Sequence, residues 1–137
     1  MALTIPRESQ ALMLGMILNK VPRDDLIVRL YTNDKEPQDS DTRSSYDEVS
    51  SMVYDPIHLD ASRWLITPGE KTEASYTEQS FTFSGEAGKV YGYYVTLDDS
   101  KDLLWAERFD DGPYNILNEG DQIRIKLHFS GEQKWPQ

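Results

Sequence analysis

Residues 90–109 read VYGYYVTLDDSKDLLWAERF, and this stretch decides the fold class. Two runs rich in β-branched and aromatic residues, 90–96 and 103–109, flank the polar connection LDDSKD. Such residues favour strands, and a short polar connection between two strands is typical of a hairpin. The stretch therefore predicts an antiparallel hairpin with its turn at residues 98–102.

Strand patterns continue on both sides of this hairpin. Residues 75–83 precede a glycine-bearing turn at 85–88, which predicts a second hairpin with 90–96 and hence a three-stranded meander. Residues 122–129, QIRIKLHF, alternate apolar and polar side chains and predict one long strand. Shorter strands are expected at 26–31, with one face buried, and at 64–67 and 114–117. Six side chains are expected in the core: Phe83, Val95, Trp105, Ile123, Ile125 and Leu127.

Many short strands separated by turns, without helices between them, favour an all-β fold. We expect a single domain over residues 1–137, built as an antiparallel, jelly-roll-like β-sandwich with one N-terminal helix. The length suffices for a core without staples, and the chain has no cysteine, so disulfides and thiolate chemistry are excluded. Residues 130–137 are expected to form a mobile end.

The N-terminal helix is predicted over residues 6–19, with Pro6 in its first turn. Gly15 alone lacks an apolar side chain between residues 11 and 18, so the apolar positions surround the helix axis. Such a helix needs cover on more than one side, either from the core of its own domain or from a neighbouring chain. For the second case, the expected oligomer or capsid contacts are Leu12, Met13, Met16 and Ile17.

The segment 34–51 is polar and crowded with like charges, and it is nearly free of aliphatic residues. A segment of this composition buries too little apolar surface to order itself. We therefore expect a mobile acidic loop, with its carboxylates solvated.

Net charge restricts the partners. The chain carries 24 Asp and Glu against 14 Lys and Arg, a formal charge of −10. This charge repels phosphates and anionic lipids, so direct binding to nucleic acid or to a membrane is not expected. The longest apolar run is too short to span a bilayer, and the start of the chain does not resemble a secretory signal. We expect the protein to be made in the cytoplasm.

Residues with catalytic potential are few. His128 lies on the polar face of an alternating strand and is expected at the surface. Asp55, His58 and Asp60 are close in sequence, but a turn held by aspartate hydrogen bonds explains them better than a metal or catalytic site. Glu107 breaks the apolar alternation between Trp105 and Phe109, and either a bulge turns it outward or it meets a buried partner such as an arginine. We expect no catalytic residue, no metal and no cofactor.

The residues from 88 to 129, GKVYGYYVTLDDSKDLLWAERFDDGPYNILNEGDQIRIKLHF, resemble small β-rich structural proteins of tailed bacteriophages. The pieces that carry the resemblance are VYGYYVT, LLWAERF followed by DGPY, and NEGDQIRI, which are scaffold pieces and not a catalytic signature. The resemblance covers about the C-terminal third. It implies a place in the virion, as a cement or decoration protein that docks as a homotrimer on the major capsid protein of an assembled shell.

Two alternatives stay open. A tail or head–tail structural component would share the same scaffold pieces. A carbohydrate-binding module, or a small hydrolase, would use the many aromatic residues as a platform, although sandwich cores use the same residues more often. The capsid reading places the protein on the outer surface of the virion, and in the host cytoplasm during assembly.

Overall fold

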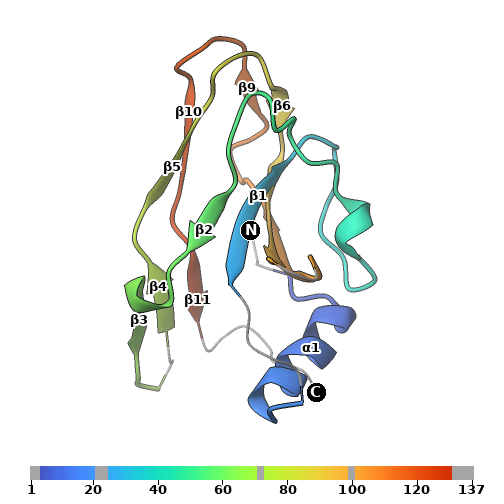
Figure 1. Ribbon diagram of the computed structural model, residues 1–137, viewed down its shortest axis with the longest axis vertical. Coiled ribbons are helices and arrows are strands. Elements are labelled where there is room, and N and C mark those ends of the chain that lie inside the picture. The colour runs from blue at the N-terminus through green and yellow to red at the C-terminus, as the bar shows by residue number, and fades with distance from the viewer. Residues whose placement is uncertain (1–3, 21–24, 71–72, 99–100, 131–137) are drawn as a thin grey trace.

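The computed structural model describes residues 4–20, 25–70, 73–98 and 101–130. The fold is β-rich, with one α-helix and several antiparallel sheets (Figure 1). The elements are α1 (Arg7–Ile17), β1 (Leu26–Tyr31), the 3₁₀ turn η1 (Arg43–Ser45), β2 (Ile57–Leu59), the 3₁₀ turn η2 (Ala61–Arg63), β3 (Trp64–Thr67), β4 (Glu73–Tyr76), β5 (Gln79–Thr82), β6 (Gly88–Val90), β7 (Gly92–Leu97), β8 (Leu103–Arg108), β9 (Tyr114–Ile116), β10 (Gln122–Ile125) and β11 (His128–Ser130).

The largest sheet has the strand order β2-β1-β7-β8. The hairpin predicted at residues 90–109 is its β7–β8 pair, which runs antiparallel with Tyr94 opposite Ala106 and Val95 opposite Trp105. A register shift follows between Val95 and Thr96. The turn was predicted at 98–102, of which residues 99 and 100 lie outside the described part of the chain.

The second predicted hairpin, between residues 75–83 and 90–96, is wrong. β5 pairs with β10, β6 pairs with β9, and β7 pairs with β1 and β8. The glycine-bearing segment is a crossover between sheets, since the Ser84 amide donates to the carbonyl of Val53 and the Ala87 amide to that of Ile116. Turn residues alone do not determine whether the strands on their two sides pair with each other. Of the predicted three-stranded meander, only the second pair, β7–β8, is present.

The single strand predicted over residues 122–129 is divided into β10 and β11. β10 pairs with β5 with Ile125 opposite Gln79, whereas β11 pairs with β4 with His128 opposite Ser75. Residues 76–78 on one side therefore face only residues 126 and 127 on the other, a bulge-like mismatch that interrupts the ladder. The alternation of burial persists through the break, because Ile123, Ile125 and Leu127 are all buried.

One continuous core joins the large sheet to the β4–β11 and β5–β10 ladders. The six side chains predicted in the core are buried, each at most 5% exposed. They belong to a cluster that also takes in residues of β1, β2 and the loop before β2. The alternating strand patterns thus predicted the buried side chains correctly, although the predicted pairing of the strands was partly wrong.

β1 is buried on both faces, which contradicts the expectation of one buried face. Val28 and Leu30 lie in the main core, whereas Ile27, Arg29 and Tyr31 on the other face are also buried. A second cluster forms there from Tyr31, Tyr46, Tyr94, Leu103 and Ala106. Tyr46 comes from the acidic segment 34–51, which therefore covers the far face of the sheet.

The helix α1 begins after Pro6 and packs against the edge strand β8. Its lead-in is held to the same strand, because the amides of Thr4 and Ala106 donate to each other's carbonyls at 2.9 and 3.0 Å. The Ser9 hydroxyl is fully buried and donates to the Leu103 carbonyl. These contacts tether the start of the helix to the sheet and leave its C-terminal turn at the surface.

Gly92 is a position where the fold tolerates no side chain. A Cβ there would lie 2.4 Å from the Glu107 carbonyl oxygen and 2.6 Å from the Tyr31 hydroxyl. We predict that Gly92→Ala lowers the free energy of unfolding by roughly 1–3 kcal/mol, because buried backbone and ring atoms must move. Chemical denaturation measures the change.

Gly85→Ala is the matched control, since its Cβ would meet only Val53 at an ordinary 3.4 Å. We expect that variant to stay within about 0.5 kcal/mol of the wild type. Equal effects of the two substitutions would contradict the close approach at Gly92.

Candidate functional site

The apolar helix α1 carries two stripes with different surroundings. Leu12, Met13 and Met16 are partly buried against the main core, in line with the buried Ser9. Leu14, Ile17 and Leu18, spaced as i, i+3 and i+4, are 47%, 70% and 64% exposed. The domain core therefore covers one side of the helix, and three large apolar side chains remain at the surface.

A cavity of about 370 Å³ lies between α1, β8 and the β3–β4 pair. Among the described residues its lining carries no charged group and comprises Met13, Met16, Ile17, Leu26, Trp64, Ala74, Leu104 and Trp105. The volume is within the range of small-molecule and side-chain pockets. The cavity is therefore suited to an apolar guest.

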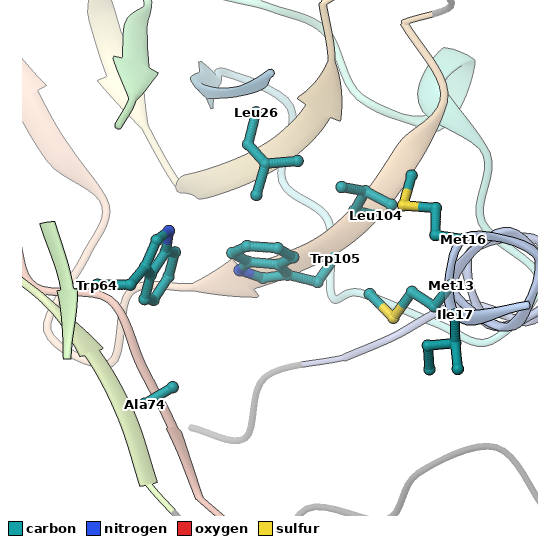
Figure 2. A pocket seen from close by; sticks show the side chains of 8 residues that line it. All are labelled: Met13, Met16, Ile17, Leu26, Trp64, Ala74, Leu104 and Trp105. Atoms are coloured by element: carbon teal, nitrogen blue, oxygen red, sulfur yellow. The ribbon is translucent and has the colours of Figure 1, made fainter. Parts of the chain in front are cut away.

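Figure 2 shows how the lining residues surround this cavity. The indoles of Trp64 and Trp105 form a tilted pair, with ring centroids 6.5 Å apart and planes at 66°. Leu26 lies on one side of the pair and Ala74 on the other, and Met13 and Ile17 approach from the helix. Polarisable methionines and broad aromatic faces adapt to apolar groups of different shapes.

The four contact residues expected from the sequence are divided by the structure. Met13, Met16 and Ile17 meet at the cavity, whereas Leu12 packs into the core. Leu14 and Leu18 were missed, although their i, i+4 spacing with Ile17 between them could have revealed a second stripe. Trp64 and Ala74 could not be found in this way, because only the tertiary fold brings β3 and β4 to the helix.

A smaller polar cavity of about 210 Å³ lies beside Glu107 and is lined also by Tyr93, Phe109, Asp110, Arg124 and Lys126. Glu107 does meet a buried partner, but the partner is Tyr93 and not an arginine. The two residues are opposite each other across β7–β8, and the Tyr93 hydroxyl donates to the carboxylate at 2.8 Å. Burial raises the pKa of Glu107, and the hydrogen bond from Tyr93 opposes this.

The two histidines belong to strands of different sheets. His58 is exposed on β2 opposite Ile27, and His128 is exposed beside Glu73. Asp60 caps η2, accepting from the Ser62 amide at 2.9 Å and its hydroxyl at 2.8 Å. The predicted aspartate-held turn is confirmed, and within the described ranges no group of three potential metal-ligating side chains is found.

The acidic segment 34–51 is anchored to the sheet, which its composition did not indicate. Asp41, Tyr46 and Val49 are buried, and Tyr46 stacks on Tyr94 with ring centroids 5.1 Å apart. Asp41 binds Lys35 at 2.8 Å and accepts from the Tyr46 hydroxyl at 2.7 Å. The expectation of solvated carboxylates is therefore wrong for Asp41, and the mobility of the segment stays a prediction.

Arg29 joins this segment to the central strand. Its guanidinium donates to both carboxylate oxygens of Glu48 at 3.1 and 3.2 Å, and to the Thr96 hydroxyl at 3.0 Å. The Tyr54 hydroxyl donates to the same carboxylate. Arg29 is only 8% exposed, so these partners must offset the cost of keeping its charge away from water.

We predict that Glu48→Ala lowers the free energy of unfolding by about 3 kcal/mol, because it leaves the buried Arg29 without its counter-charge. Glu78→Ala is the matched control. Glu78 pairs with Arg124 at 3.9 Å, and both side chains are more than half exposed. We expect Glu78→Ala to lower the free energy of unfolding by less than about 1 kcal/mol. Equal losses for the two variants in denaturation curves would contradict a larger stabilising role of the Arg29–Glu48 pair.

Acid should loosen the acidic segment. Burial alone would raise the pKa of Asp41, but hydrogen bonds from Lys35, Tyr46 and the Gln38 amide outweigh it and hold that pKa below its ordinary 3.8. A lowered carboxylate pKa stabilises the fold above the unfolded value, and this stability is lost as the pH falls below it. We predict that Asp41→Asn weakens the fold at neutral pH and flattens the fall in stability below about pH 4.

Denaturation midpoints between about pH 2 and pH 7 measure this change. Asp39→Asn, at an exposed position two residues away, is the control and should keep the slope of the wild type. An unchanged slope in Asp41→Asn would contradict the assignment.

Among the described residues, no helix combines the length and the apolar character that a membrane crossing needs. Comparison with family models, with curated proteins and with solved structures gives no match.

Proposed function

We propose that the protein is a non-enzymatic structural component of a tailed-phage virion, a decoration protein that binds the outer surface of the assembled capsid. The observation that carries the proposal is the exposed stripe of Leu14, Ile17 and Leu18 beside the apolar cavity. The resemblance of the C-terminal third to phage structural proteins supports the virion location. The partner is the major capsid protein, which the chain meets after synthesis in the host cytoplasm.

The stripe has the properties of a docking surface. Large apolar side chains that gather at the surface mark sites of association, whereas scattered ones do not. On the shell side, we propose an apolar protrusion that enters the cavity between Trp64, Trp105 and Ile17. A repetitive shell presents this protrusion many times, so modest individual contacts can sum to stable decoration.

Charge adds a second element to the docking mode. With a formal charge of −10, the chain stays soluble and is attracted to a basic surface. Binding to the shell should weaken as salt rises if the rim of the contact is electrostatic. The proposal also extends to the fold, as a jelly-roll-like sandwich whose layers are the large sheet and the ladders that share its core.

The positions of the aromatic residues favour this proposal over a carbohydrate-binding module. Tyr93, Tyr94 and Trp105 are buried, and the partly exposed Tyr91 lies under the Arg108 guanidinium at 5.1 Å. These rings serve the core more than an open platform. A tail or head–tail component would use the same docking surface at a lower copy number, so counting chains per particle separates the two locations.

The test uses phage shells stripped of the chain and incubated with the purified protein. We predict that the wild type co-sediments with the shells and that Ile17→Asp weakens binding at least tenfold, because a charge cannot enter an apolar contact. Ile17 is 70% exposed, so the substitution should leave the fold intact. Deleting the whole helix would not serve, since Ser9 and the Thr4 bridge hold β8.

Met52→Asp is the matched control, an equally apolar side chain that is 86% exposed in the loop beside Ser84. It should bind as the wild type does. The proposal fails if the wild type does not sediment with shells, or if the Ile17 and Met52 variants bind alike.

A further inference from the structure

The strand β3 is an edge that the described part of the chain leaves open. In the sheet order β11-β4-β3, its inner side pairs with β4, and no strand among the described residues pairs with its outer side. Its four residues, WLIT, include no charge and no proline. Leu65 and Ile66 point to opposite faces, and each is 64% exposed.

Open apolar edges are uncommon because they template pairing with another strand, and proteins protect them with charges, prolines or covering segments. This chain does so at β8, where the Thr4 segment pairs with Ala106 and the buried Ser9 bonds to Leu103. The four residues of β3 include neither a charge nor a proline, and among the described residues no strand covers its outer side. The edge at β8 is therefore covered, whereas the edge at β3 carries the features of a pairing strand.

We infer that β3 pairs antiparallel with β3 of a second copy of this chain. Antiparallel pairing of one strand with its own copy is self-complementary and closes after two chains, leaving neither edge open. It also sets the start of each strand opposite the end of the other. Arg63 directly precedes β3 and Glu70 lies three residues after its end, so antiparallel pairing brings Arg63 of one copy to the end of the strand that leads to Glu70 of the other.

β3 contributes Trp64 to the cavity described above, but the pairing contact uses the outer edge of this strand and not the exposed stripe of α1. In Figure 1, β3 lies on the far side of the molecule from α1, with β4 and β11 between them in that view. A chain paired through β3 therefore keeps the stripe of Leu14, Ile17 and Leu18 for another partner. The inference does not depend on the virion proposal, and either can fail alone.

The size of the contact sets its strength. A ladder of four residues from each chain buries less surface than the roughly 800 Å² per partner of a standard stable interface. Pairing in solution should therefore be reversible and dependent on concentration. A two-fold pair also differs from the homotrimer expected from the sequence, and the same measurement distinguishes the two.

The test is sedimentation velocity and equilibrium of the full chain over a wide concentration series. We predict that the wild type passes from monomer to dimer as concentration rises. The double variant Leu65→Lys/Ile66→Lys, which places the charges that protect natural edges, should raise the dissociation constant at least tenfold. Leu117→Lys, at a side chain 51% exposed after β9, is the matched control and should dimerise as the wild type does.

Circular dichroism and thermal unfolding confirm that each variant is folded, so that a lost dimer reports on the contact. A wild type that stays monomeric at every concentration would overturn the inference. So would a trimer, or a dimer that survives the double variant and is lost in Ile17→Asp, which would place the contact at α1.

Discussion

The buried guanidinium of Arg29 is the constraint on which the rest of the structure depends. It lies on the central strand β1, on the face opposite the main core, where an unpaired charge would be costly. Glu48 and Thr96 satisfy it, one from the acidic segment and one from the neighbouring strand β7. The ion pair that compensates this one charge thus holds the acidic segment over the sheet.

That cover converts a half-exposed sheet into a layer buried on both faces. Once the segment lies across β1 and β7, Tyr46 stacks on Tyr94 and meets the edge of Tyr31. The tyrosine cluster explains why β7 is buried at every residue from Gly92 to Leu97. Gly92 then becomes obligatory, since the Tyr31 ring occupies the space where a side chain would stand.

Because both faces of this sheet are covered, the surfaces available for binding lie at its edges, at α1 and the cavity beside it. The N-terminal segment is tied to β8 through Thr4 and Ser9, and this tether holds the inner stripe of α1 over Leu104 and Trp105. The outer stripe has no such cover from the described core. The apolar cavity lies at the junction of the helix, β8 and the β3–β4 pair (Figure 2).

The candidate site was predictable in part. A helix that is apolar on all sides predicts one apolar face that the core of its own domain does not cover. Ile17 lies on this face, since it is both an expected contact and an exposed residue. Met13 and Met16, two of the other expected contact residues, line the cavity and pack against the core of their own domain. Trp64 and Ala74 carry no local signal, because they are distant in sequence from α1 and reach it only through the strand order β11-β4-β3.

By itself, the sequence determined the elements that rest on local periodicity: the helix, the β1 and β8 strands, the β7–β8 hairpin, and the burial of Ile123, Ile125 and Leu127. Only the tertiary structure decided that β5 pairs with β10, that β6 pairs with β9, and that the polar segment 34–51 covers a sheet. The physical reason is that alternation records which face of a strand is buried, whereas pairing and the rescue of a buried charge such as Arg29 depend on partners far along the chain.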